Sequence, residues 1–338
     1  MVVSNPGEII KLAGKLAATA SMKLDYARFA DKSRKILLVE GSTDEFFVSH
    51  VKEDDVETMV ADNVFNSEAG FRTSPCEYVN CKEAITQLIF GISHLPSGFL
   101  QLPDSMDKLD IYGLVDRDND ELDTGRPTPR LFVTDTHDLE TLMMSTDDEL
   151  FGKIDGCSIT EADVRRAYFA ALQLSVCREL LAEYYDDESF DLSVIACGSF
   201  RVNFSAFMQN DKINICDLIK YIAAKSASPL PTKKIKQLTE KLLNDKSVKR
   251  RFDADGFWKQ DSDNFAPDNI DGFWTSVNGH DILQLIQYYN EDAYMRFGSH
   301  GYSGINRRFE NVLLAVYDYS DFSKTSVCEK MKVANIAR

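Results

Sequence analysis

The chain has 338 residues, a length that predicts two compact modules or one large module with an appendage. Hydrophobic residues make up 44% of it and charged residues 27%, a balance that is typical of a globular protein. The formal net charge of −16 argues against broad, nonspecific binding to nucleic acid, because phosphates are attracted by a positive field. This charge weakens the case for a nuclease without excluding one that gathers carboxylates for metal and confines its basic residues to one groove.

Nothing in the sequence predicts export or contact with a membrane. No apolar run approaches the length of a membrane-spanning helix, and residues 1–14 lack the basic start and continuous apolar run of a secretory signal. Seven cysteines are scattered without a CxxC pair, which argues against a zinc site or a disulfide framework. We therefore expect a cytoplasmic protein with reduced thiols.

Hydrophobic periodicity in the first part of the chain predicts alternating helices and strands. The predicted elements are, in order, a helix over 8–30, a strand over 35–39, a helix from Ser42, a helix over 82–92, a strand over 109–115, a loop over 116–129, a strand over 131–133 and a helix over 137–144. Ser42, with Glu45 three residues later, has the spacing of a capping box. Strands that alternate with helices predict an α/β fold with a mainly parallel sheet of about four or five strands, flanked by helices.

From about residue 148 onward the pattern is mostly helical. It predicts a helix over 162–185, a short strand over 192–197, two helices within 213–245 and a helix over 282–289. We therefore expect an N-terminal helical segment over 1–33, an α/β domain over 34–147 and a mostly helical C-terminal domain over 148–338. Basic residues are frequent over 225–251, where they either contact an anionic partner or form a solvated helix face; interleaved acids favour the solvated face.

Acidic side chains stand where the predicted strands end. Glu40 closes the first strand, Asp116 and Asp118 close the next, and Glu140 lies just past the third. In a parallel sheet these ends share one edge, and hard cations such as Mg²⁺ prefer oxygen ligands of this kind. Asp44 lies one helical turn beyond Glu40 and can share its metal. In a chain with 54 acidic residues, each of these acids taken singly is an ordinary loop carboxylate. It is their conjunction, in order, that predicts a metal centre.

Four segments carry a resemblance to a known family. They read VEGSTDEFF over 39–47, GLVDRDND over 113–120, TDTHDLETLM over 134–143 and NGHDILQLI over 278–286. The first two resemble the signatures of TOPRIM, the fold that topoisomerases, primases and OLD-family nucleases share. The whole set resembles the DUF4435 proteins, a subgroup that includes the effector nuclease of the PARIS anti-phage system. The resemblance covers roughly residues 34–290, and the four motifs in order are more specific than any one of them.

The resemblance implies a role for each matching acid. Glu40 would bind metal or act in acid–base chemistry, and Asp116 and Asp118 would bind Mg²⁺, for which Mn²⁺ can substitute. Asp44 matches the acid that OLD-like nucleases use for a second metal, and Glu140 matches a further acid of the subgroup. In phosphodiester hydrolysis one such metal activates water and the other stabilises the leaving oxygen.

A positive group is also expected beside the phosphate, and His280 and Lys82 are the candidates. The alternative for His280 is a structural residue at a helix start. The alternative for Lys82 is an ordinary solvated lysine. His137 and Asp138 are expected only to orient Glu140.

The sequence thus predicts a Mg²⁺-dependent endonuclease that cleaves RNA, with tRNA among the candidates, or DNA. By resemblance it would be the toxic effector of a bacterial anti-phage system, held in check by an ABC-type ATPase and forming a homodimer when active. An alternative is a catalytically inactive TOPRIM-like module that regulates an ATPase; intact Glu40, Asp116 and Asp118 favour the enzyme. A primase or topoisomerase fragment is disfavoured, because the sequence has no zinc-ribbon cysteines.

Overall fold

The chain forms two compact units in the computed structural model. Unit 1 comprises Met1–Asp135 and Asp318–Arg338, and unit 2 comprises Thr136–Tyr317. The structure describes residues 6–23, 34–66, 80–94, 109–118, 128–184, 192–195, 202–226, 230–248, 257–259, 262, 265–270, 272–297 and 305–338. The part of the predicted 8–30 helix beyond residue 23 and most of the predicted loop, residues 119–127, lie outside these ranges.

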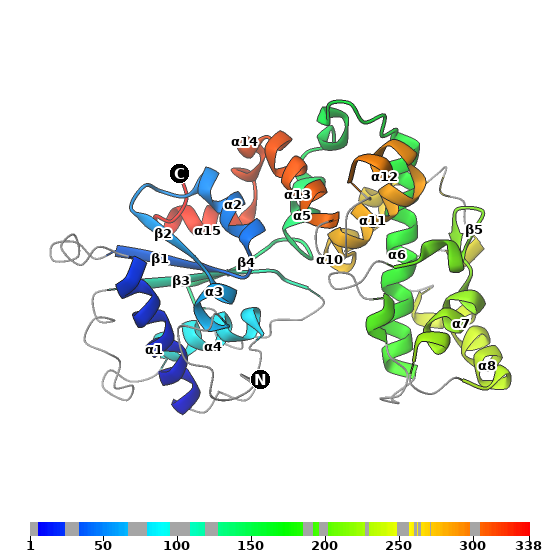
Figure 1. Cartoon of the computed structure of the whole chain (residues 1–338), viewed down its shortest axis with the longest axis horizontal. Helices are drawn as coiled ribbons and strands as arrows, with labels where there is room; N and C mark the ends of the chain where they lie inside the picture. Colours follow the sequence, from blue (N-terminus) through cyan, green and yellow to red (C-terminus); the bar gives the residue numbers. More distant parts are fainter. Residues whose placement is uncertain are drawn as a thin grey trace. The chain divides into compact units, whose positions relative to one another are not determined.

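Within the described ranges of unit 1, the sheet has four strands, all of them parallel, in the order β2-β1-β3-β4. They are β1 (Arg34–Val39), β2 (Val56–Val60), β3 (Leu109–Val115) and β4 (Leu131–Val133), shown in Figure 1. This confirms the predicted α/β fold with a mainly parallel sheet. The sequence did not predict β2, which is short and sits at an edge of the sheet beside β1.

Helices cover both faces of this sheet (Figure 1). On one face lie α1 (Pro6–Lys23), α3 (Ala61–Phe65) and α4 (Cys81–His94), and on the other lie α2 (Ser42–Val51), α14 (Tyr319–Phe322) and α15 (Ser326–Val333). Alternation along β1 explains the two layers: Ile36 and Leu38 join the core beneath α1 and α4, while the neighbouring residues of the strand point the other way. On the second face Phe47 of α2 packs edge-on against Phe322 at 5.0 Å between ring centroids.

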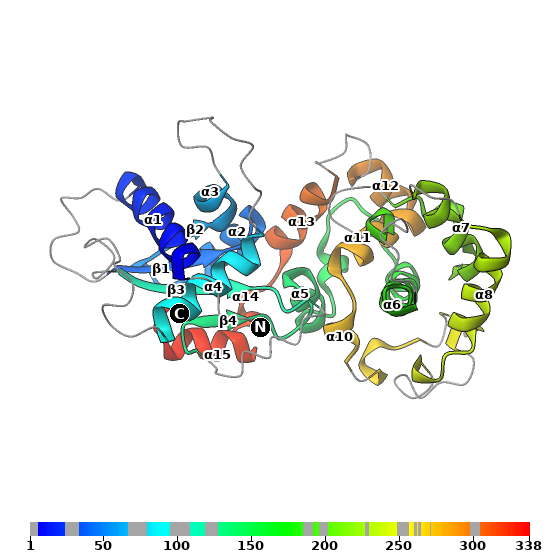
Figure 2. The same ribbon diagram turned by 90° about the horizontal axis from the view of Figure 1, so that it is seen from below.

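Unit 2 is mostly helical, as predicted for the C-terminal region. Its α-helices are α5 (Leu139–Thr146), α6 (Glu161–Tyr184), α7 (Ile215–Lys225), α8 (Thr232–Leu243), α10 (Phe273–Ser276), α11 (Gly279–Tyr289), α12 (Glu291–Phe297) and α13 (Ile305–Val316). A small antiparallel pair, β5 (Met208–Gln209) and β6 (Lys212–Ile213), completes it. Figure 2 looks along α6, which packs against α11. Among the described residues, no helix is both long and apolar enough to cross a membrane.

The strand predicted over 192–197 is wrong. Leu192–Ile195 forms a 3₁₀ turn. The Ile195 carbonyl accepts a hydrogen bond from Nε of Arg178 at 2.8 Å, so a side chain on α6 takes the place of a strand partner. Along α8, Leu238 and Leu242 are buried and the lysines are exposed. The choice between a solvated face and contact with an anionic partner stays a prediction.

The two units divide the chain at other places than the ranges 1–33, 34–147 and 148–338. Packing explains the difference at each end. α1 contributes Ile9 and Leu16 to the core of the sheet, so it belongs to unit 1. α5 packs against α10 and α11, which places it in unit 2. The last residues return to unit 1, where α15 packs on β4 and Arg338 donates to the Val51 carbonyl at 2.9 Å.

Candidate functional site

The first group of candidate residues lies at the carboxyl-terminal edge of the parallel sheet. The register sets Leu38 of β1 opposite Gly113 of β3, so the residues that follow the two strands come out side by side. Glu40 Oε1 accepts a hydrogen bond from the Asp116 amide at 2.8 Å. The structure therefore brings Glu40 into contact with the backbone of Asp116, although the sequence placed the two residues at separate strand ends.

Asp118 and Lys82 form a pair at the same edge. Lys82, in the first turn of α4, is only 8% exposed, and its Nζ donates to Asp118 Oδ2 at 2.7 Å and to the Arg117 carbonyl at 3.0 Å. Asp118 adopts a left-handed backbone with φ of 49°, a conformation that few residues other than glycine take up as readily as Asp or Asn. The alternative of a solvated Lys82 is wrong, because this lysine is buried against an acid of the predicted site.

Asp44 closes the turn between β1 and α2. Its Oδ2 accepts a hydrogen bond from the Gly41 amide at 2.7 Å. Gly41 is the N-cap of α2, so the predicted capping box of Ser42 with Glu45 is wrong: the acid that reaches back is Asp44, three residues after the real cap. This hydrogen bond holds the Asp44 carboxylate near the end of β1.

Negative charge exceeds positive charge at this edge. Burial raises the pKa of Glu40 to about 7, and the Asp44 and Asp118 carboxylates push it in the same direction. The Asp116 amide and the Lys82 ammonium act against them. We call Glu40, Asp44, Lys82, Asp116 and Asp118 together the strand-edge cluster.

A second group of candidate residues lies in unit 2, where two helices begin next to each other. Asp138 is the N-cap of α5, and its Oδ1 accepts a hydrogen bond from the Thr141 amide at 2.8 Å. Its Oδ2 accepts one from the Gly279 amide, the first residue of α11, at 2.7 Å, and lies 3.1 Å from His137 Nδ1. One carboxylate thus joins the starts of both helices.

Gly279 is required for this close approach. A Cβ atom at this position would lie 2.5 Å from Glu140 Cβ and 2.6 Å from Asp138 Oδ1. Because the position has no side chain, the first turn of α11 reaches the first turn of α5. The next residue along α11, His280, therefore lies beside Glu140.

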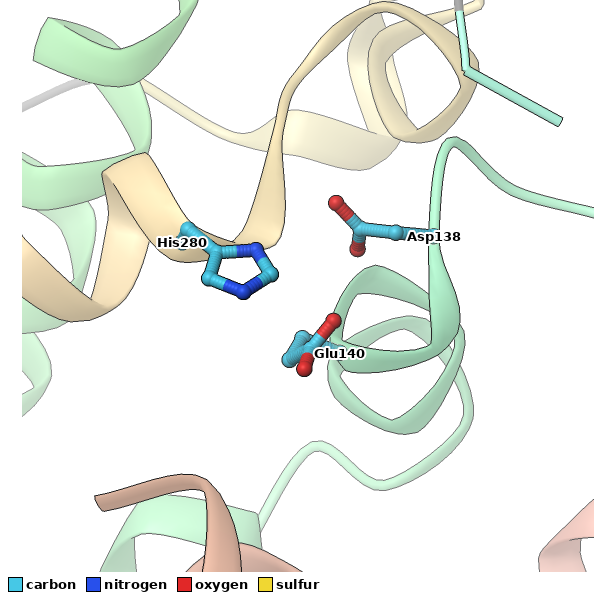
Figure 3. A group of neighbouring side chains, drawn as sticks. All are labelled: Asp138, Glu140 and His280. Carbon is cyan, nitrogen blue, oxygen red and sulfur yellow. The ribbon is translucent and has the colours of Figure 1, made fainter. Parts of the chain in front are cut away.

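These contacts produce a compact group of three potential metal ligands. One ligand atom each from Asp138, Glu140 and His280 lies within 4.8 Å of the others, and the three side chains face a common space in Figure 3. Across the described ranges, no other His, Cys, Asp or Glu side chains form a group of this kind. Glu310 of α13 adds a fourth charged group, with Oε1 3.3 Å from His280 Nε2. We call these four residues the helix-start cluster.

Burial and neighbouring charges shift the pKa values of His280, Glu140 and Asp138. Burial alone would lower the pKa of His280, but the Glu140, Glu310 and Asp138 carboxylates raise it to about 9. Burial raises the pKa of Glu140 to about 8, assisted by Asp138 and Glu310 and opposed by His280. Burial also acts to raise the pKa of Asp138, but His137 and His280 outweigh it and hold that pKa below its usual value.

The predicted site residues are thus divided between the two units. Glu40, Lys82 and the other strand-edge residues belong to unit 1, while Glu140 and His280 belong to unit 2. A single centre that contains all of them stays a prediction. Sequence reasoning assigned Asp138 only an orienting role and missed Glu310. Local pattern gave no signal for Glu310, which stands between Phe309 and the polar Asn311.

No protein-family model and no curated protein matches this chain. The functional proposals below are supported by its own residues.

Proposed function

We propose that the chain is a Mg²⁺-dependent endonuclease of the TOPRIM type, centred on Glu40, Asp116 and Asp118. The observation that carries the proposal is the 2.8 Å contact between the Glu40 carboxylate and the Asp116 amide at the carboxyl-terminal edge of a parallel sheet. Binding sites of open α/β sheets form at this edge. The order and spacing of the two acidic motifs, VEG and DRD, support the TOPRIM identity.

The residues at this edge fit Mg²⁺ or Mn²⁺. All of the acids offer hard oxygen donors. Burial raises the pKa of Glu40, and the neighbouring Asp44 and Asp118 carboxylates raise it further, against the opposing Asp116 amide and Lys82 ammonium. Mg²⁺ in enzymes commonly uses only one or two carboxylates and completes its shell with water and substrate phosphate. The acids therefore need not lie as close together as the ligands of a fully protein-bound ion.

Each residue has a distinct part in this proposal. Asp116 and Asp118 hold the metal, which supplies Lewis-acid stabilisation and an activated water for phosphodiester hydrolysis. Lys82 fixes the Asp118 carboxylate and balances its charge. Asp44 fixes the turn that carries Glu40 and offers a further ligand. Glu40, which faces both strand ends, binds metal or transfers the proton.

We further propose that this nuclease is the toxic effector of an anti-phage system, with RNA, tRNA included, or DNA as its substrate. A nuclease in its own cytoplasm has to be restrained, and the resemblance supports an ABC-type ATPase as the restraining partner. The net charge of −16 supports docking on a basic protein surface and disfavours free encounter with nucleic acid. Release from the partner would then permit self-association into a homodimer and cleavage.

The test is cleavage of tRNA, single-stranded RNA and duplex DNA by the purified chain in Mg²⁺, in Mn²⁺ or in EDTA. Glu40→Gln and Asp116→Asn should each slow cleavage by about 100-fold or more, on the scale of losing a general acid–base group. Glu83→Gln is the matched control, because Glu83 is an exposed acid next to Lys82. Cleavage that survives EDTA or Glu40→Gln would refute the metal-dependent mechanism. A chain that binds an ATPase and cleaves nothing, even after release, would be the interaction module instead.

A further inference from the structure

The helix-start cluster contains a buried carboxylate, that of Glu140, whose only hydrogen-bond donor among the described residues is its own backbone amide. Glu140 is only 4% exposed, and its side chain points toward Asp138 and His280 (Figure 3). Within the part of the chain that the structure describes, no other residue donates a hydrogen bond to this carboxylate, whereas both oxygens of Asp138 accept backbone amides. Three buried acids, Asp138, Glu140 and Glu310, face the single imidazole of His280, so a bound cation would compensate negative charge that His280 alone does not balance.

We propose that Asp138, Glu140 and His280 bind one divalent transition-metal ion of the Zn²⁺ class, and that the site is complete within unit 2. The three potential ligand atoms already lie within 4.8 Å of one another. An imidazole with two carboxylates is a donor set that Zn²⁺ and related ions accept, whereas Mg²⁺ is bound almost wholly by oxygen. The proposed ion is thus of a different class from that at the strand-edge cluster.

Glu310 has the position of a supporting group. It lies 3.3 Å from His280 Nε2, which leaves Nδ1 of the imidazole to face the ion. Metal-binding histidines commonly contact a carboxylate through their other ring nitrogen, which fixes the ring orientation. In this proposal the buried Glu310 on α13 fixes the orientation of the His280 imidazole.

The surrounding contacts hold the three ligands in place before any ion binds. The Asp138–Gly279 hydrogen bond fixes the two helix starts against each other. Asp281, next to His280, is fully buried and binds the Arg178 guanidinium through both of its carboxylate oxygens. Ligands on helices that are tied together in this way are pre-organised for a metal.

The experiment is metal binding by the full chain after treatment with a chelator. Zn²⁺ binding is measured by competition with a chromophoric chelator, and Co²⁺ serves as a spectroscopic probe of the same site. We expect one ion that excess Mg²⁺ does not displace. Glu140→Gln keeps the side-chain volume and should weaken binding by more than about 100-fold, as should His280→Ala; Glu310→Gln should weaken it by roughly 10- to 100-fold, the range for an outer-shell partner. Glu149→Gln, an exposed acid just beyond α5, should change nothing.

The outcomes separate this proposal from the nuclease. Circular dichroism in EDTA checks that each variant is folded. The double variant Glu40→Gln/Asp116→Asn should lose cleavage and keep the tightly bound ion; loss of the ion in this variant would overturn a site complete within unit 2. Equal binding by wild type and Glu140→Gln would overturn the site altogether. If the chain binds the ion and cleaves no nucleic acid, the metal site is supported and the proposed nuclease function is refuted.

Discussion

The two acidic clusters are built from similar residues but are suited to different chemistry. At the strand edge the acids are partly exposed, with the Asp118 side chain at 45%, and the positive partner is a lysine. At the helix starts Asp138 and Glu140 are buried, and the positive partner is an imidazole. Lysine can only balance charge, whereas histidine can also coordinate a metal. Burial and the identity of one basic residue therefore decide which cation each cluster suits.

The clusters also differ in what positions them. Sheet register alone sets Glu40 beside Asp116, because adjacent parallel strands end together. The helix-start cluster depends instead on one tight contact between helices, in which Gly279 meets Asp138. The first arrangement tolerates side-chain change, and the second is sensitive to a single methyl group.

The largest expected effect is the arrest of cell growth. Growth measurements on variants of the two clusters test whether both clusters serve one reaction. If the chain is the proposed nuclease, its expression without the proposed ATPase partner should arrest growth, because uncontrolled nucleic-acid cleavage is toxic. Glu40→Ala should restore growth while pull-down of the ATPase partner stays unchanged. Undiminished toxicity of Glu40→Ala would refute the proposed nuclease mechanism.

The same growth measurement on Glu140→Gln sharpens the comparison. Toxicity that persists in this variant would confine catalysis to unit 1. Toxicity lost as completely as in Glu40→Ala would mean that both clusters contribute to a single reaction, as the motif resemblance implies.

The sequence predicted most of the backbone elements of unit 1, but it did not predict which charged side chains are buried. Apolar runs that end at Glu40 and Asp116 were enough to predict β1 and β3, since such runs suit strands buried on both faces. β2 was missed because its five residues, VETMV, are short and follow directly on three acids. Lys82 and Glu310 could not be judged from local pattern, because only tertiary packing decides whether a charged residue is buried.

Removing the buried partner of Asp118 should lower the stability of unit 1. Lys82→Met leaves the Asp118 carboxylate without its ammonium at 2.7 Å and should cost unit 1 about 2 kcal/mol; Asp118 is partly exposed, which keeps the loss below that of a fully buried pair. Urea unfolding followed by circular dichroism measures it. The control is Lys324→Met, which breaks the pair of the exposed Lys324 ammonium with Asp321 and should cost clearly less than Lys82→Met. Equal losses would show that the Lys82–Asp118 pair is no stronger than a surface pair.

Gly279→Ala should break the second cluster without removing any charge. The new methyl group meets Glu140 Cβ and Asp138 Oδ1, and overpacking of this kind costs about 2 kcal/mol. The same change should weaken Zn²⁺ binding, because it pushes the starts of α5 and α11 apart. Gly152→Ala is the matched control, since no atom lies within 4 Å of its added Cβ, and its effect should stay within about 0.5 kcal/mol. Unchanged stability and metal binding in Gly279→Ala would mean that the helix starts can separate at no cost.

The smallest expected effect concerns Asp163, which stabilises unit 2 away from both clusters. Its Oδ2 accepts hydrogen bonds from the Thr160 amide at 3.0 Å at the start of α6 and from Asn290 Nδ2 at 3.0 Å after α11. Asp163→Asn keeps the shape of the side chain but weakens these contacts, and should cost about 1 kcal/mol at neutral pH, the usual value for a helix cap. Thermal unfolding of the full chain measures it. Glu161→Gln, two residues away in the same helix, changes an exposed ion pair and should have almost no effect.

The pH dependence of that loss identifies its cause. Burial would raise the pKa of Asp163, but hydrogen bonds from Asn290 and Thr160 outweigh burial and hold the pKa below its usual value. A carboxyl group whose pKa is lower in the folded state stabilises the fold above its unfolded-state pKa, about 4, and loses this contribution as the pH falls through the folded value. The difference in unfolding temperature between wild type and Asp163→Asn should therefore be full at pH 7 and shrink below about pH 4. A difference that is constant across this range would show that the negative charge of Asp163 does not cause the loss of stability. If unit 2 unfolds in a transition separate from unit 1, the shift should appear in that transition only, because all of the partners of Asp163 named here lie within unit 2.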